Sequence, residues 1–186
     1  RLIQVIQSAA VITLVLNVVA MLKQEARRPD LTDHARARPT FGKAWRDFIA
    51  LPQARGLLWA LGLGTMGFTM QDILLEPYGA QVLGLSVSDT TLLTAMFAGG
   101  MVLALILTSR RLGKGSDPIR VASTGILIGI SAFAAVIFSA PLQAPALFQI
   151  GAAMIGLGNG LFAVGMLTAA MEFGGDKMAG LTLGAW

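Results

Sequence analysis

The chain has 186 residues, of which 55% are hydrophobic and 13% are charged, and its net charge is +4. Soluble globular domains carry about 25% charged residues, so this composition argues against an ordinary soluble domain and indicates a membrane protein. The absence of cysteine excludes disulfides, thiolate metal sites and a cysteine nucleophile. Basic membrane proteins usually carry their excess Lys and Arg in cytoplasmic loops, so the positive charge does not indicate nucleic-acid binding.

Five apolar segments are each long enough to cross a membrane, which takes roughly 20 mainly apolar residues. They cover residues 2–22, 57–78, 91–109, 119–140 and 144–171. One such run could belong to a soluble helical core, but five in one chain predict an all-α, polytopic transmembrane helical bundle. The chain begins with Arg and ends in a further apolar run, so we interpret it as an internal piece of a longer protein.

The segment 23–55 is a polar, basic connection between the first two spans. Its first part has the composition of a flexible linker and holds His34, which we expect to be a solvated loop residue. After Thr40, a suitable N-cap, apolar residues recur at helical spacing. These residues are Phe41, Trp45, Phe48 and Ile49. The pattern predicts a short amphipathic helix on the inner membrane surface; the alternative is a soluble helix packed on neighbouring loops.

The positions of Lys and Arg predict how the chain is oriented in the membrane. Lys and Arg occur in the connections 23–55, 110–118 and 172–178, whereas the connections 79–90 and 141–143 hold none. The positive-inside rule therefore places 23–55, 110–118 and 172–178 in the cytoplasm. The basic residues of the middle connection are Arg110, Arg111 and Lys114.

A polar group interrupts the end of the second span. Asp72 and Glu76 are four residues apart, so a helix places them on one face, a turn apart. A charge in hydrocarbon costs at least ~2.5 kcal/mol, so it is rarely retained without a function or a partner. Gln71 and Tyr78 complete the group, and Pro77 removes a backbone donor beside them. Two interpretations stay open: a ligand-binding or gating surface, and a structural cluster near the outer interface.

Glycines recur at a spacing of four in the last two spans. The pairs Gly125/Gly129 and Gly156/Gly160 predict that helix backbones approach closely there. The run 156–160 has no nearby Lys-Ser/Thr and does not follow a strand, so we reject a phosphate-binding loop. Asn159 within this run is a candidate ligand contact, because a buried amide needs a hydrogen-bond partner.

The sequence offers little catalytic chemistry. Since the single histidine lies in the polar linker, the membrane segments hold neither a histidine-based hydrolase site nor a His-rich metal site. A pigment's magnesium would have to take a carboxylate, an amide, water or a backbone carbonyl. We therefore predict a protein that is not an enzyme and has no metal site and no covalent cofactor.

A long cytoplasmic connection followed by four spans resembles the join between the two six-helix halves of a major facilitator superfamily protein. On this mapping the chain covers about helices 6–10 of 12. Residues 1–22 are the last helix of the N-terminal half, 23–55 the linker, and 56–186 part of the C-terminal half. Substrates of such proteins are bound near the membrane midplane.

A more specific resemblance lies in the second span. The run Met70-Gln71-Asp72-Ile73-Leu74-Leu75-Glu76-Pro77-Tyr78-Gly79 resembles the signature of the PucC/LhaA family, and Ala98-Gly99-Gly100 is similar to the family's next helix. This resemblance implies a light-harvesting complex assembly protein of the bacterial inner, photosynthetic intracytoplasmic membrane.

The resemblance also implies partners. These are the lipid bilayer, the light-harvesting antenna polypeptides, and bacteriochlorophyll or its synthesis machinery, with no nucleic acid. On this view the protein delivers bacteriochlorophyll, as a transient ligand, to antenna polypeptides or chaperones them. The alternative is a proton-coupled secondary transporter of an amphipathic solute, which would use Asp72 and Glu76 as proton carriers.

Overall fold

The computed structural model describes residues 2–22 and 40–185, except for the side chains at 2, 5, 72, 174–180 and 185. Within these ranges the secondary structure is helical. The helices are α1 (Leu2–Leu22), α2 (Phe41–Ala50), α3 (Pro52–Val82), α4 (Val87–Leu112), α5 (Pro118–Ser139) and α6 (Pro145–Ala185). The chain divides into two compact units, Arg1–Pro39 and Thr40–Trp186. The first unit contains α1, and the second contains the other five helices.

Local sequence signals explain where the helices of the second unit begin. Proline occupies the first turn of α3, α5 and α6, where its missing N–H has no helical partner to lose. Before α4, Ser86 and Asp89 form a capping box, in which each side chain accepts the other residue's backbone N–H. The Asp117 side chain caps α5 by accepting the backbone N–H of Ile119 at 2.8 Å.

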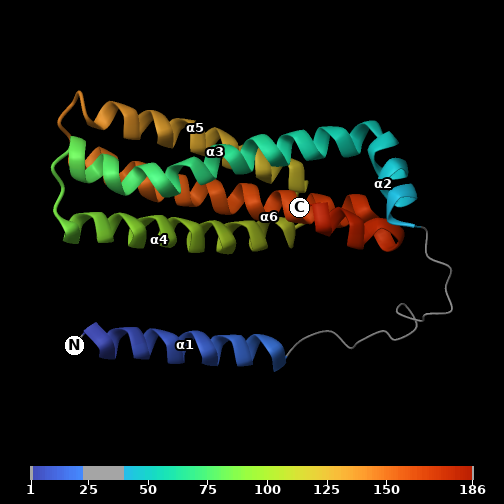
Figure 1. Cartoon of the computed structure of the whole chain (residues 1–186), viewed down its shortest axis with the longest axis horizontal. Helices are drawn as coiled ribbons and strands as arrows, with labels where there is room; N and C mark the ends of the chain where they lie inside the picture. The colour runs from blue at the N-terminus through green and yellow to red at the C-terminus, as the bar shows by residue number, and fades with distance from the viewer. Residues whose placement is uncertain (1, 23–39, 186) are drawn as a thin grey trace. The chain divides into compact units, whose positions relative to one another are not determined.

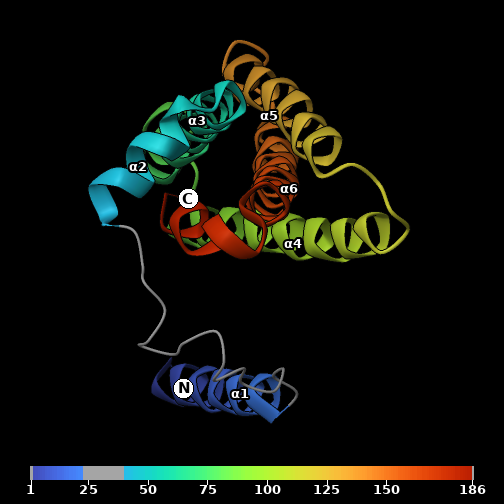
Figure 2. The ribbon, with the colours of Figure 1, turned by 90° about the vertical axis from the view of Figure 1, so that its right-hand side faces the viewer.

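Helix α6 forms the centre of the bundle (Figures 1 and 2). It packs closely along α4 and α5, and less extensively against α3. Its inner surface carries Phe148, Ile155 and Phe162, which are buried in the main hydrophobic core. The ring of Phe68 on α3 meets that of Phe162 at a centroid distance of 5.6 Å. The core therefore joins α3, α4 and α5 through α6.

The predicted role of glycine in close helix packing is confirmed. A Cβ atom built on Gly125 of α5 would lie 2.5 Å from the carbonyl oxygen of Gly158 on α6, so the backbones leave no room for a side chain. The same holds on the other side of α6, where a Cβ on Gly156 would overlap the backbone of Phe97 on α4. Small residues thus set the separation of these helices.

Three of the predicted spans qualify as membrane-crossing helices by length and composition in the described part of the chain. They are Val87–Leu112, Pro118–Ser139 and Pro145–Phe173. The first predicted span, residues 2–22, is helix α1, and its stretch Ile6–Leu22 is apolar. Helix α3 is long enough but is not among these three helices, so the span over residues 57–78 stays a prediction. The all-α class and a bundle of membrane-crossing helices are thereby confirmed.

Several predicted connections are shorter than expected. The connection between α3 and α4 is reduced to residues 83–86, where Gly84 has a φ of +64°. Arg110 and Arg111 belong to the last turn of α4, so only Lys114 of the predicted basic loop lies in the connection itself. Residues 172–178, which we predicted to connect two spans, are helical within α6. The helices continue past their apolar stretches into charged residues, because these residues still form backbone hydrogen bonds within the helix.

The amphipathic helix is present as α2, with Thr40 at the N-cap position but without a side-chain capping hydrogen bond. Its apolar face is only partly directed outward. Phe48 is fully buried and meets the ring of Phe173 on α6 edge-on at 5.9 Å, whereas Phe41 is 73% exposed. Part of this apolar face is therefore held by packing on α6. This arrangement resembles the alternative considered above, a helix packed on its neighbours. His34 and the linker around it lie outside the described residues.

Candidate functional site

Helix α3 positions the polar residues singled out by the sequence. It continues through Pro77 to Val82, so helical geometry holds across the whole polar group. Gln71 is 5% exposed and Tyr78 is half-buried, whereas Glu76 is exposed. The side chain of Asp72 lies outside the described part of the structure. Gln71 and Tyr78 are seven residues apart, which is about two helical turns and places them on the same face.

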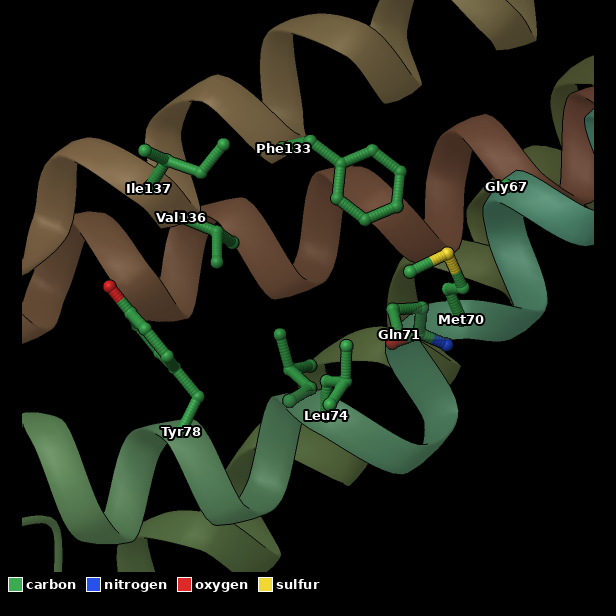
Figure 3. Close-up of a pocket in the computed structure, with 9 residues that line it drawn as sticks. Gly67, Met70, Gln71, Leu74, Tyr78, Phe133, Val136 and Ile137 are labelled. Atoms are coloured by element: carbon green, nitrogen blue, oxygen red, sulfur yellow. The ribbon is translucent and has the colours of Figure 1, made fainter.

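An open groove of about 430 Å³ runs along that face of α3, between α3 and α5 (Figure 3). Its lining residues come from these two helices. They are Gly67, Met70, Gln71, Leu74, Leu75, Tyr78, Phe133, Val136 and Ile137. The groove exists because α3 and α5 pack mainly on α6, and their backbones do not approach closely. Gly67 adds further space, since no atom lies within 4 Å of the position of its missing Cβ.

The groove, which we call the α3/α5 groove, presents an almost wholly apolar surface, although Gln71 and Tyr78 are among its lining residues. Figure 3 shows Gln71 near Met70 in one part of the groove and Tyr78 reaching from α3 towards α5 in another. The Tyr78 ring packs against Phe148 of α6, with a centroid distance of 5.8 Å. A ligand in this groove would therefore meet almost wholly apolar walls, which are the main part of most small-molecule sites.

The groove is open to the side of the bundle. Met70 and Ile137, on its opposite walls, are 56% and 64% exposed. Such side chains on a membrane-crossing bundle face lipid or another apolar partner. A ligand could therefore enter the groove laterally, between helices, without passing through the bundle.

Glu76 is directed to a different neighbour. Its carboxylate accepts a hydrogen bond of 2.8 Å from the Thr94 hydroxyl of α4. Glu76 thus links α3 to α4 and does not line the α3/α5 groove. The predicted polar group is therefore divided, with Gln71 and Tyr78 on one side of α3 and Glu76 on the other.

Asn159 does not line the α3/α5 groove, but it lies at the depth of Gln71. Helices α3 and α6 run antiparallel, and Phe68 of α3 meets Phe162 of α6. Gln71 lies three residues after Phe68, and Asn159 lies three residues before Phe162. Because the two helices run in opposite directions, both residues lie on the same side of this contact and at a similar depth in the bundle. Asn159 is half-buried, and its side chain makes no hydrogen bond to the described residues. Its role as a ligand contact stays a prediction.

The basic residues lie far from the groove's tyrosine. Tyr78 is near the end of α3 that connects to α4, and Arg110, Arg111 and Lys114 are at or beyond the opposite end of the 26-residue α4. In the described part of the chain, no three His, Asp or Glu side chains gather as a metal-binding group. The geometry therefore separates a lateral apolar groove from a basic helix end.

The chain is similar in sequence to known proteins. The family model described as "PUCC protein" matches residues 1–186. The chain belongs to the PucC protein family. A Protein PucC of Rhodovulum sulfidophilum is 48% identical over 194 residues, covering 100% of this chain and 42% of the relative. A Protein PucC of Cereibacter sphaeroides is 42% identical over 186 residues, covering 100% of this chain and 40% of the relative. No solved structure matches the chain significantly.

Another relative carries a chemically informative name. A Rhodobacter capsulatus protein named "Bacteriochlorophyll synthase 44.5 kDa chain" is 30% identical over 159 residues, which is 80% of this chain and 36% of the relative. The chain thus spans about two fifths of the length of the curated relatives. The resemblance of residues 70–79 to the PucC signature is confirmed as family membership, and the structure places that signature on α3, along the groove.

Sequence reasoning missed several residues of this region. Thr94 could have been found as a hydroxyl in an apolar helix next to the polar group, although only the fold pairs it with Glu76. The apolar residues Met70, Leu74, Phe133 and Val136 of the groove carry no distinguishing signal, because they look like any lipid-facing or core residue of a span.

Proposed function

We propose that this PucC family chain is part of a membrane assembly factor for light-harvesting complexes, and that its α3/α5 groove holds bacteriochlorophyll or an antenna helix during transfer. The observation that carries the proposal is the apolar, laterally open groove lined by Gln71 and Tyr78 of the PucC-like segment. One family relative is named as a bacteriochlorophyll synthase chain, which supports a connection with this pigment.

The shape and chemistry of the groove fit a large amphipathic ligand. An open groove covers one edge or the tail of a tetrapyrrole and leaves its remainder in contact with lipid or an antenna helix. The almost wholly apolar wall of the groove suits the hydrophobic edge or tail of such a pigment. Lateral access also suits an assembly factor, because antenna helices and pigments both reside in the bilayer. We place the protein, on the same grounds, in the photosynthetic inner membrane.

A groove-filling substitution tests the proposal. Gly67→Leu places an isobutyl group in the groove without a backbone clash, since no atom lies within 4 Å of its Cβ position. Gly62→Leu is the matched control, because Gly62 lies on the same helix, also has open space, and does not line the groove. Both are introduced into the full-length protein, in a strain that lacks the native copy.

Assembled antenna is measured from the near-infrared absorption of membranes, with the protein level measured in parallel. We expect Gly67→Leu to lower assembled antenna severalfold at normal protein level and Gly62→Leu to have little effect. Full antenna assembly with Gly67→Leu would refute the groove as the site. Normal antenna in the strain lacking the protein would refute the assembly role, and an accumulated pigment precursor would point to an enzyme instead.

A further inference from the structure

A second hollow, of about 480 Å³, lies where α4 ends and α5 begins. Its lining comes from the last turn of α4, the connection and the first turns of α5. These residues are Arg111, Gly115, Ser116, Asp117, Arg120, Val121 and Thr124. Both helices are long and apolar enough to cross a membrane, so the hollow lies at the membrane boundary. Figure 1 shows this end of the bundle opposite the turn that joins α3 and α4. We call it the basic hollow.

The charge of the basic hollow is strongly unbalanced. Arg111 and Arg120 approach it from two different helices, and both are exposed. In the described part of the chain neither arginine forms an ion pair, and Arg110 and Lys114 add positive charge beside them. Asp117 is the one acidic lining residue, and its carboxylate accepts the backbone N–H of Ile119. Glu172 lies in the adjoining hollow, so it does not neutralise the two arginines directly.

The surface that leads away from the basic hollow is apolar. Helices α4 and α5 pack on opposite sides of α6, and their backbones approach each other over only a short stretch (Figure 2). Between them lies a second hydrophobic cluster, centred on Ala104, Val121 and Leu161, with Leu157 and Ile128 only partly buried at its edge. The partly buried edge of this cluster, at Leu112, Leu157 and Ile128, forms an apolar strip that begins beside the arginines.

We propose that the basic hollow binds the phosphate of an anionic phospholipid, whose acyl chains lie along the strip between α4 and α5. Two guanidinium groups can bind one phosphate through paired hydrogen bonds, and arginine keeps its charge at any accessible pH. Basic pockets between membrane helices on the cytoplasmic side are known to suit such headgroups. The apolar strip favours a phospholipid over free phosphate, because only the lipid has chains to cover it.

The test uses the delipidated full-length protein in mild detergent. Its thermal stability is followed while phosphatidylglycerol, phosphatidylcholine or inorganic phosphate is added, and bound lipids are counted by native mass spectrometry. We expect phosphatidylglycerol to bind and stabilise, and the other two to act only at much higher concentration. The double variant Arg111→Gln/Arg120→Gln should weaken phosphatidylglycerol binding about thirtyfold, given the usual contribution of a basic residue at an anionic surface.

Lys43→Gln/Arg55→Gln is the charge-matched control, since both residues are exposed and lie outside the basic hollow. An equal loss in this control would show general charge attraction and overturn the site. Equal stabilisation by inorganic phosphate would overturn the lipid assignment, as would equal binding of phosphatidylcholine. If the double variant does not purify as a folded protein, Arg120→Gln alone carries the test, with an expected weakening of about fivefold; unchanged binding in that variant would also overturn the proposal.

Discussion

The contact between α5 and α6 gives a quantitative prediction for Gly125→Ala. A Cβ at Gly125 would lie 2.5 Å from the Gly158 carbonyl oxygen and 2.6 Å from the Phe162 backbone nitrogen. Side-chain carbons in proteins essentially never come closer than 3.0 Å to such atoms, so the two backbones must separate by at least about 0.5 Å. Because both obstructing atoms belong to the backbone, no rotamer change can relieve the clash.

The energetic balance follows from two opposing effects. Overpacking a tight contact costs about 1–3 kcal/mol, while replacing glycine by alanine within a helix stabilises by about 1 kcal/mol. The clash here moves one of the two most extensive helix interfaces of the bundle, so we expect the upper part of the range and a net loss of about 2 kcal/mol. The melting temperature should fall by several degrees.

This loss is measured by heating the full-length protein in mild detergent. Size-exclusion chromatography then gives the fraction that remains folded at each temperature. Gly99→Ala is the control: Gly99 is helical, lies in α4 and has no atom within 4 Å of its Cβ position. We expect it to leave stability unchanged or to raise it by up to about 1 kcal/mol. Equal melting temperatures for Gly125→Ala and Gly99→Ala would refute the argument that glycine sets the helix separation.

Further predictions concern the polar link, the amphipathic helix and the topology. Glu76→Ala and Thr94→Val should each reduce antenna assembly, and the double variant should lose no more than the worse single variant, because each change removes the same hydrogen bond. Additive losses would contradict a shared role. Asp47→Asn is the control, because Asp47 is exposed and lies on α2, away from this hydrogen bond. Phe48→Ala should cost about 3–5 kcal/mol of thermal stability, and exposed Phe41→Ala much less; similar losses would show that α2 is not anchored by Phe48. In intact cells, a cysteine introduced at Val87 should react with an external impermeant thiol reagent and one at Ala37 should not, and the reverse labelling would refute the orientation.

Part of the site could be predicted from the sequence. Gln71 and Tyr78 stand out because polar side chains are rare in an apolar run, and helical spacing places them on one face. The division of the polar group could not be predicted. Glu76 pairs with Thr94, which is 18 residues further along the chain, and only the packing of α3 beside α4 brings the two together.

The sequence by itself determined the helical, membrane-crossing character of the chain, the start of α2 after Thr40, and the close packing at glycine pairs, because hydropathy, helix starts and side-chain size are local properties. Tertiary structure alone decided that α3 and α5 both pack on α6 and leave a groove between them. The spans are apolar on most faces, so the sequence pattern does not distinguish a face that meets a helix from one that meets lipid. That choice depends on shape complementarity between helices distant in the chain, and in this protein the shape complementarity is set by glycines meeting backbone and by aromatic rings filling the remaining space.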